Sequence, residues 1–500
     1  MSTTIVWFRN DLRIDDHPAL AEASRDAVVC MFVLDDAADG DWAPGAASRW
    51  WLHRSLAALD AALRRLGARL VLRRGDTIGH LAEVAQATGA ERVVTTARCE
   101  PAAVELDARA GRELAARGVR FARFDGALLH DPGEIRTGAG TPYRVFTPFW
   151  KSCLERGADS APLRAPRQLV DAGEAVASAP LDSLELEPRI AWDEGLRSEW
   201  TPGSEGAAKR WKVFARGALR SYAVGRDRCA ERGSSMLSPH LHFGEISVRR
   251  LWHDLARMER TLRGDRRPPR SRLDAARARP RTGSAPDDAA AAIESIRVFR
   301  AELGWREFAH HVLAAFPSTT DAPLRPEFAR LPWRRDAALL RAWQRGRTGY
   351  PLVDAGMRQL WATGWMHNRV RMIAASFLVK HLLQPWQEGA RWFWNTLVDA
   401  DLANNTMGWQ WSAGCGADAA PFFRIFNPVS QGASFDAEGR FVRRWVPELA
   451  GLAPKWIHRP WQAPASALSH AGIELGGDYP RPIVDHAEGR TRALEAFDSI

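Results

Sequence analysis

The hydrophobic positions of the first 130 residues form short continuous runs separated by longer amphipathic stretches. The runs are rich in β-branched and aromatic residues, as buried strands are, and lie at 4–8, 27–34, 69–72, 92–96 and 119–124. The stretches between them repeat at helical spacing, most clearly at 46–66 and 103–117. Because strand and helix alternate, the pattern predicts an α/β doubly wound parallel-sheet domain over residues 1–130.

A charged segment follows the first predicted strand. It contains Arg9, Asp11, Arg13 and Asp16. Ligand-binding loops often lie at the carboxyl ends of parallel strands, so the segment is a candidate ligand loop. Turn and helix-cap chemistry from its aspartates is the structural alternative, and the sequence leaves both open.

The pattern changes twice further along the chain. Residues 131–204 become rich in proline, serine and acidic side chains and are predicted to be an interdomain linker. From residue 205 to residue 500 helical spacing dominates, which predicts a second, all-α domain. Within it, the stretch 263–286 holds eight arginines and four prolines. It is predicted to be a mobile loop, with a basic tether for DNA as the alternative.

An unusual mixture of side chains lies at 364–428. Trp365, Asn368, Arg369 and Met372 recur at three- and four-residue spacing, which predicts one face of a helix. A core stripe would carry leucine and isoleucine, whereas indole, amide, guanidinium and thioether suit a flat aromatic ligand with polar edges. The alternative is a surface helix edge.

Acids, amides and indoles follow within this stretch. Asp399 and Asp401 precede Asn405, Trp409 and Trp411. Such groups are costly to bury unless a partner satisfies them, and Arg371 is a natural counter-ion for Asp399. An Asp-x-Asp segment is otherwise typical of a loop cap, and that alternative remains open.

Two more segments carry candidate chemistry. Small hydroxyl residues at 233–238, with Tyr222 upstream, precede a helical run and could bind an anion through backbone amides, or simply cap the helix. Glu302 and Trp305 share a helix face, with Arg306 adjacent, and could present an acid beside a stacking ring. An exposed ion-pair helix is the alternative there.

Composition narrows the class of protein. The net charge of +9 favours a polyanionic partner, and the five scattered cysteines indicate neither a disulfide framework nor a metal site. No apolar run approaches a membrane span and no leader is evident, so we expect a cytoplasmic protein. Nine of the 22 tryptophans fall between Trp333 and Trp411, more than packing requires.

These segments resemble the photolyase and cryptochrome family of flavoproteins, specifically the bacterial class I cyclobutane pyrimidine dimer (CPD) photolyases. The most specific motifs are WMHNR at 365–369, the run 405–411 and RIFNP at 424–428. The resemblance covers the chain from Thr4 to about Pro464. It implies that the all-α domain binds FAD.

The resemblance assigns roles residue by residue. FAD would be held by Tyr222, Ser234, Ser235, Met236, Leu237, Ser238, Trp365, Asn368, Arg371, Asp399, Ala400, Asp401 and Asn405. Met236 stands where the family usually has arginine. DNA and its lesion would be held by Arg226, Glu302, Trp305, Arg306, Asn368, Arg369, Met372, Trp411, Arg424 and Gln431.

The implied reaction is light-dependent repair of DNA that contains pyrimidine dimers. Photolyases are known to flip the damaged base out of the duplex. Excited, reduced, anionic FAD then donates an electron, the cyclobutane ring splits and the electron returns. Glu302 and Asn405 would serve the reaction directly, while Trp409, Trp386 and Trp333 would form a chain between the flavin and the surface through which light reduces the flavin.

The resemblance leaves several alternatives. Asn405 stands where plant cryptochromes have aspartate, which favours repair over photoreception, and the chain ends 36 residues after Pro464, short for a signalling tail. Repair of 6-4 photoproducts would call for a histidine pair, whereas Asn368 follows His367 here. Relatives also carry an antenna chromophore, a folate or a deazaflavin; the segment 99–105 lacks the Asn-Glu pair of folate binders. We expect a monomer.

Overall fold

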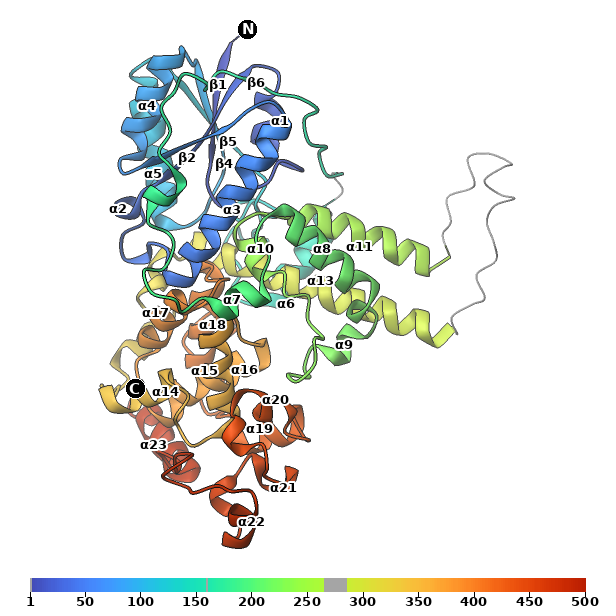
Figure 1. The fold of residues 1–500 in the computed structure, drawn as a ribbon, viewed down its shortest axis with the longest axis vertical. Helices are drawn as coiled ribbons and strands as arrows, with labels where there is room; N and C mark the ends of the chain where they lie inside the picture. Colours follow the sequence, from blue (N-terminus) through green and yellow to red (C-terminus); the bar gives the residue numbers. More distant parts are fainter. Residues whose placement is uncertain (1, 159–160, 265–285) are drawn as a thin grey trace.

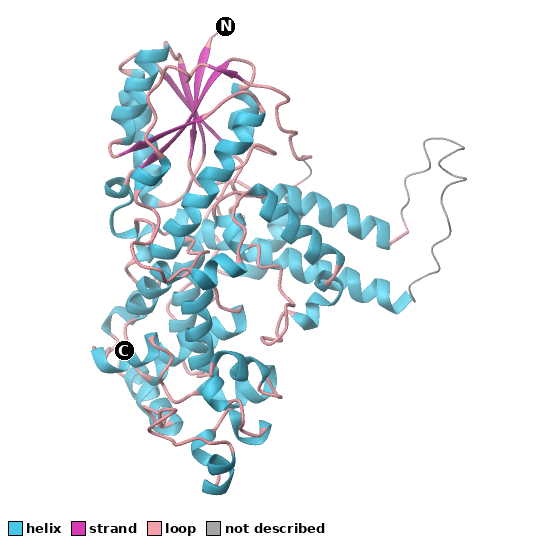
Figure 2. Cartoon of the chain, viewed as in Figure 1, coloured by secondary structure: helices cyan, strands magenta, loops and turns pink. Residues whose placement is uncertain are grey.

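A computed structural model describes residues 2–158, 161–264 and 286–500. All strands of the sheet gather at one end of the molecule, and the rest of the described chain is built from helices and loops (Figure 2). The predicted division into a sheet-containing part and a helical part is therefore confirmed, while the domain boundaries at residues 130 and 204 stay predictions.

The sheet is parallel throughout, with β1 at its centre. Its strand order is β3-β2-β1-β4-β5, and a short β6 also pairs with β2. The chain order reverses beside β1, so the crevice next to β1 and β4 is the expected ligand site of such a sheet. The strands are β1 (Thr3–Phe8), β2 (Ala27–Leu34), β3 (Leu70–Arg74), β4 (Arg92–Thr96), β5 (Arg120–Phe124) and β6 (Val170–Asp171).

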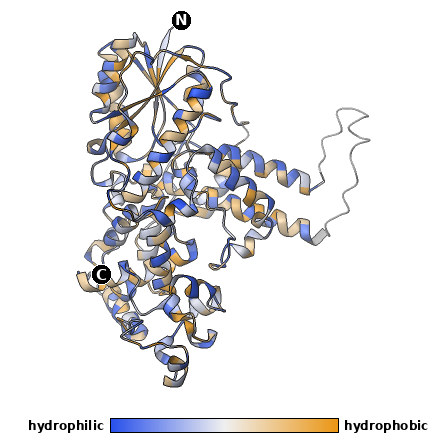
Figure 3. Cartoon of the chain, viewed as in Figure 1, coloured by the Kyte–Doolittle hydropathy of each residue, from blue (hydrophilic) through white to orange (hydrophobic). Residues whose placement is uncertain are grey.

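Helices cover both faces of the sheet, and its strands are coloured as mainly hydrophobic in Figure 3. Both faces of the sheet are apolar, which is why both are covered. One face packs Phe8 and Phe32 against Trp51. The other packs Ile5 and Met31 against helices that follow β3 and β4. The helices of this part are α1 (Pro18–Ala23), α2 (Asp36–Asp39), α3 (Ala46–Arg65), α4 (Thr77–Thr88) and α5 (Pro101–Ala115).

The predicted linker is more ordered than its composition suggests. It contains α6 (Phe146–Arg156), β6 and α7 (Glu194–Glu199). Phe149 of α6 packs on Phe308 in the helical part, whereas β6 extends the sheet, so this region is bound to both parts. Weak periodicity in the sequence hid these contacts, because each element is short.

The helical part occupies the lower half of Figure 1. Helices α11 and α13 lie side by side and project from it, and the prediction of a mobile arginine-rich loop falls on residues 265–285, outside the described residues. The helices are α8 (Ser204–Arg216), α9 (Tyr222–Gly225), α10 (Ser238–His242), α11 (Val248–Leu262), α13 (Pro286–Ala315), α14 (Ala337–Gln344), α15 (Pro351–Thr363), α16 (Asn368–Ser376), α17 (Trp386–Thr396), α18 (Leu402–Ala413), α19 (Pro428–Phe435), α20 (Arg440–Trp445), α21 (Pro454–Ile457), α22 (Ala465–His470) and α23 (His486–Asp498).

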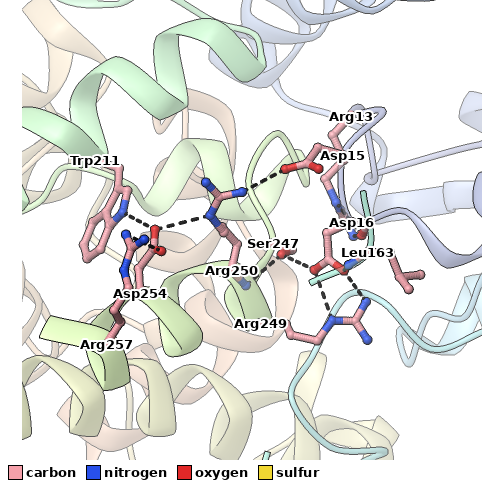
Figure 4. Close-up of polar contacts among 10 residues, drawn as sticks. All are labelled: Arg13, Asp15, Asp16, Leu163, Trp211, Ser247, Arg249, Arg250, Asp254 and Arg257. Atoms are coloured by element: carbon pink, nitrogen blue, oxygen red, sulfur yellow. Dashed lines mark hydrogen bonds and ion pairs between the residues drawn. The ribbon is translucent and has the colours of Figure 1, made fainter. Parts of the chain in front are cut away.

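The charged loop after β1 joins the two parts. Asp16 is buried and accepts hydrogen bonds from Ser247 and from Arg249, at 2.6 Å between Oδ1 and Nη2 (Figure 4). Arg13 donates to the carbonyl of Gly244. Of the predicted alternative, the turn chemistry is confirmed, because Asp11 accepts from the N–H of Arg9 at 2.7 Å, and the helix cap is wrong, because His17 caps α1. The loop fixes α11, and with it the helices behind α11, to the edge of the sheet.

Candidate functional site

A cavity of about 540 Å³ lies among helices α9, α10, α13, α16, α17 and α18. Its size is that of a ligand pocket, and rings and polar groups share its walls. The structure brings most predicted site residues to this one cavity: Tyr222, Arg226, Ser235, Ser238, Glu302, Trp305, Arg306, Trp365, Asn368, Arg369, Arg371, Met372, Asp399, Ala400, Asp401, Asn405, Trp409 and Trp411.

One wall of the cavity is built on an ion pair. Nη2 of Arg371 lies 2.8 Å from Oδ2 of Asp399, which confirms the predicted pairing. Ser238 donates to the same carboxylate at 2.5 Å. The predicted helical position of Trp365 is wrong: α16 begins at Asn368, and His367 caps it by accepting from the N–H of Arg369. Trp365 reaches the cavity from the loop before the helix.

Helix α18 supplies the opposite wall. Asn405 donates from Nδ2 to the carbonyl of Ala390 at 3.0 Å. Because a carbonyl only accepts, this bond leaves Oδ1 of Asn405 as an acceptor beside the cavity. A Cβ built on Gly408 would meet no atom within 4 Å, so bare helix backbone faces the cavity there. A flat ligand can therefore approach α18 closely.

The serine segment is only partly at the cavity. Ser235 and Ser238 line it, whereas Ser234, Met236 and Leu237 do not. Met236 has a φ of 52°, and Nη1 of Arg210 lies 3.4 Å from its sulfur. A non-glycine residue in this region is uncommon, so this turn is held in a specific shape just before α10. Backbone groups of the turn remain the candidates for an anion.

Charged and aromatic groups cluster on the α13 side of the cavity. Arg226 donates to Glu302 at 2.5 Å, and Phe146 stacks on Trp305 with ring centroids 3.8 Å apart. Burial opposes the charge of Arg226, but Glu302 outweighs it and raises the pKa of the guanidinium. The guanidinium of Arg306 donates to the carbonyl of Ala127, in the sheet-containing part.

The remaining predicted DNA contacts are spread more widely. Nη2 of Arg369 lies 2.7 Å from Asp227, with its guanidinium over Phe435. Arg424 is exposed, and Gln431 is half-buried on α19. Neither Arg424 nor Gln431 lines the cavity. They lie outside it, in positions that only a larger ligand could contact.

The three predicted electron-carrying tryptophans run from buried to partly exposed. Trp409 lines the cavity and packs on Gly389, where a Cβ would meet its ring at 2.0 Å. Trp386 lies one turn before Gly389 on α17 and is also buried, while Trp333 is half-buried. Trp343, which the sequence did not single out, contacts Trp409 edge to face with centroids 6.1 Å apart.

Several residues that line the cavity were not predicted from the sequence. They are mostly apolar residues with no pattern of their own: Leu241, His242, Phe299, Leu303, Met366, Ala375, Phe393, Leu397, Asn404, Met407, Gly408 and Ser412. Only Asn404 carried a usable signal, because it stands in the same polar run as Asn405. His242 had none, because it is set by the fold against a loop of the sheet-containing part.

A second cavity, of about 320 Å³, lies where the carboxyl ends of β1 and β2 and the segment after β4 meet the helical part. Trp7, Phe32, Trp42 and Trp394 provide rings, while Arg98 and Glu100 are among its polar groups. This position matches the crevice expected from the strand order. It could hold a second flat ligand.

Two family profiles match the chain. The first, described as DNA photolyase, matches residues 4–167, and the second, the FAD binding domain of DNA photolyase, matches residues 299–499. Among characterised proteins, a deoxyribodipyrimidine photo-lyase of Agrobacterium fabrum is 43% identical over 99% of this chain and 98% of its own. Cryptochrome-1 of Arabidopsis thaliana is 39% identical over 99% of this chain and 70% of its own.

Solved structures agree. A bacterial class III photolyase from Agrobacterium tumefaciens superposes with a TM-score of 0.91 at 43% identity, over 100% of this chain and 98% of its own. A cryptochrome from Synechocystis has a TM-score of 0.86 at 27% identity, over 99% of both chains. The expectation of class I is not confirmed, because the relative with the higher identity is described as class III.

Proposed function

The chain belongs to the photolyase and cryptochrome family of flavoproteins, and we propose that it uses FAD and light to split cyclobutane pyrimidine dimers in DNA. The observation that carries the proposal is the convergence of two sets of residues on one cavity. The Arg371 and Asp399 pair faces it with Asn405, and Glu302 faces it beside Trp305. One set suits a flavin and the other a damaged base.

The residues present fit FAD. The exposed backbone at Gly408 leaves room for a flat ring, and Asn405 and Asp401 offer acceptors beside it. Arg371 and the turn at Ser235 offer donors. When bound and reduced, FAD supplies the electron that light makes available. The chain's own residues orient the cofactor, exclude water and set the polarity around it.

The α13 side of the cavity suits a flipped base. Glu302 can hydrogen-bond a base edge, and Trp305 and Trp411 offer aromatic surfaces beside it. Arg226 is already ionically paired with Glu302, so it can hold the acid in place or turn to a phosphate. Arg369 and exposed Arg424 are the further candidates for phosphate contacts.

A direct test is blue-light illumination of the chemically reduced protein with an oligonucleotide that carries one cyclobutane thymine dimer. Loss of the dimer in the light and not in the dark is the expected result. In parallel, Glu302→Ala should lower the repair yield per photon while the flavin content stays unchanged. A flavin-loaded wild type that leaves the dimer intact would overturn the proposal.

Blue-light photoreception is the second candidate, because cryptochromes match the chain over nearly its full length. Asn405 argues against it. Its amide donates to the carbonyl of Ala390 and has no acidic proton to give a flavin. A protein that photoreduces but repairs no dimer would support this candidate.

Repair of 6-4 photoproducts has less support. His367 caps α16 and is buried, and it does not line the cavity. Burial lowers the pKa of His367 to about 4, so it is neutral and poorly suited to act as an acid at neutral pH. An oligonucleotide with one 6-4 lesion, illuminated in the same way, should stay unrepaired.

The second cavity is where we propose that an antenna chromophore binds. Its rings suit a folate or a deazaflavin, and Arg98 could pair with an anionic tail. The absorption and emission of the purified protein, compared with those of a variant that fills the cavity, Ala38→Trp, would identify the ligand. A wild type and variant with identical spectra would argue against occupancy.

Two finer expectations belong to the same proposal. The protein would act as a monomer in the cytoplasm, and static light scattering of the purified protein tests the first expectation. Within the described ranges, every helix is too short or too polar to cross a bilayer.

A further inference from the structure

A buried cluster of titratable groups lies behind the FAD cavity, between it and the second cavity. Oδ2 of Asp401 lies 3.4 Å from Nε2 of His310 and 3.6 Å from Nδ1 of His242. Asp401 and His242 both line the 540 Å³ cavity, whereas His310 lies behind them on α13. The cluster is not explained by capping alone.

The hydrogen bonds of the cluster fix its protons. Nδ1 of His310 lies 2.9 Å from the carbonyl of Arg306, and a carbonyl only accepts, so Nδ1 carries a hydrogen. Nε2 faces the carboxylate of Asp401, which attracts a second hydrogen onto that ring. Because both ring nitrogens then donate, His310 is an imidazolium.

His242 has a different charge. Arg98 donates to Oδ1 of Asn10, which orients that amide so that its Nδ2 faces Nε2 of His242 at 3.4 Å. Nε2 is therefore an acceptor, and the ring's only hydrogen lies on Nδ1, facing Asp401. His242 is neutral where His310 is charged.

The other oxygen of Asp401 is also satisfied. Oδ1 accepts from the backbone N–H and from the side-chain amide of Asn404, at 2.9 and 2.7 Å. These bonds cap α18, the helix that carries Asn405 and Trp409. A carboxylate held on both oxygens cannot rotate, so its remaining lone pairs keep a fixed direction.

We propose that His310 is a positively charged positioning residue which, with neutral His242, holds Asp401 as an ionised hydrogen-bond acceptor at the wall of the FAD cavity. This inference rests on the proposed function and deepens it. The ligand group that meets Asp401 must be an N–H or O–H donor, as a flavin ring and its ribityl chain both have. The charge of His310 keeps that acceptor available at all pH values near neutrality.

The charged groups around Asp401 and His310 support the assignment of both residues as ionised. Burial opposes ionisation of both partners, but their mutual attraction outweighs it: the pKa of Asp401 lies well below its usual range, and the pKa of His310 is raised. The charged or titratable groups that face the pair come from three segments of the chain: His242 of α10, Arg306 and Glu307 of α13, and Arg98, Cys99 and Glu100 after β4.

The chain offers a matched control in the next residue. His311 is also buried on α13, but its Nδ1 donates to the carbonyl of Pro132 and its Nε2 accepts from the N–H of Tyr143. His311 is therefore neutral, and among the described residues no carboxylate pairs with it. It lies outside both cavities.

The first experiment reads the charge directly. Long-range proton–nitrogen spectra of the purified full-length protein labelled with ¹⁵N-histidine distinguish imidazolium from neutral rings, and the signals are assigned by loss in His310→Gln and in His311→Gln. At pH 7.5 His310 should give an imidazolium pattern and His311 a neutral one. A neutral His310 would overturn the proposal, whatever the protein does to DNA.

The second experiment measures the affinity for FAD against pH. His310→Gln should weaken FAD binding by about tenfold, the size of losing one charge-assisted hydrogen bond. The loss should grow as the pH falls, because Asp401 without its cation takes up a proton. His310→Arg should restore most of the affinity, and His311→Gln should bind as the wild type does.

Equal affinities and equal pH profiles for His310→Gln and His311→Gln would contradict the proposal. If His310→Gln fails to fold, loss of the signal in His310→Arg assigns it instead, and the charge measurement on the wild type still decides the proposal. The repair assay is independent, since a protein that fails to split dimers can still show a charged His310 and pH-dependent FAD binding.

Discussion

Two acidic loops of this protein look alike in sequence and have different roles. The loop after β1 carries Asp15 and Asp16, and the loop before α18 carries Asp399 and Asp401. Both carboxylate oxygens of Asp16 accept hydrogen bonds from within the protein, from Leu163, Ser247 and Arg249. Asp399 and Asp401 are equally buried but stand at a cavity wall.

The difference teaches that burial of an acid does not identify a ligand site. One aspartate of each loop pairs with an arginine, Asp16 with Arg249 and Asp399 with Arg371, so the charge pattern cannot separate the loops. What separates them is whether the wall beside the carboxylate is filled by protein, as at Asp16, or left open, as at Asp399. The first loop therefore holds the two parts together, and the second is free to bind.

The largest expected effect is on the joining loop. Asp16→Asn should lower the free energy of unfolding by about 3 kcal/mol, because Ser247 and partly buried Arg249 lose the buried anion to which they donate. Equilibrium denaturation monitored by tryptophan fluorescence measures this. The neighbouring pair of Asp15 and Arg250 is about half exposed, so Asp15→Asn should cost less than about 1 kcal/mol. Equal losses would contradict the assignment of Asp16 as the joining residue.

The cavity loop should respond in the opposite way. Asp399→Asn should weaken FAD binding by about tenfold, because Arg371 and Ser238 lose the charge that orients them. The FAD-free protein should lose only about 1 kcal/mol of stability, the size of one ordinary hydrogen bond, because the guanidinium of Arg371 faces the open cavity. Titration of the FAD-free variants with FAD, followed by flavin fluorescence, makes the comparison. An Asp16→Asn protein with the same loss of affinity would erase the distinction.

A third substitution, Asn405→Asp, should change the protonation of the bound flavin and leave the affinity for FAD unchanged. Asn405→Asp replaces the amide that donates to the carbonyl of Ala390, so the new carboxyl must keep a proton to retain that bond. It becomes an acid beside the flavin, and the yield of anionic reduced flavin on illumination should fall. Absorption spectra during photoreduction report this. Spectra that match the wild type would mean that residue 405 does not set the flavin's protonation.

How far the sequence could predict these features depends on the range of the signal. The strands and the pairing of Arg371 with Asp399 came from local patterns and simple charge complementarity. Trp365 was misplaced because its spacing to Asn368 imitates a helix that begins only at Asn368. His242 and His310 carried no signal, because their charges follow from Asn10, Asp401 and a backbone carbonyl that only the fold brings near them.

The smallest expected effect concerns the tryptophans that lie outside the cavity loop and supply electrons to the flavin. Trp333→Phe should slow flavin photoreduction severalfold, since phenylalanine is much harder to oxidise than an indole, while repair by chemically reduced enzyme should be unchanged. Trp343→Phe is the informative partner, because the Trp343 ring contacts the Trp409 ring directly. Transient absorption after a light flash measures both rates. If only Trp343→Phe slows reduction, electrons reach Trp409 through Trp343, and the predicted route from Trp333 through Trp386 is wrong.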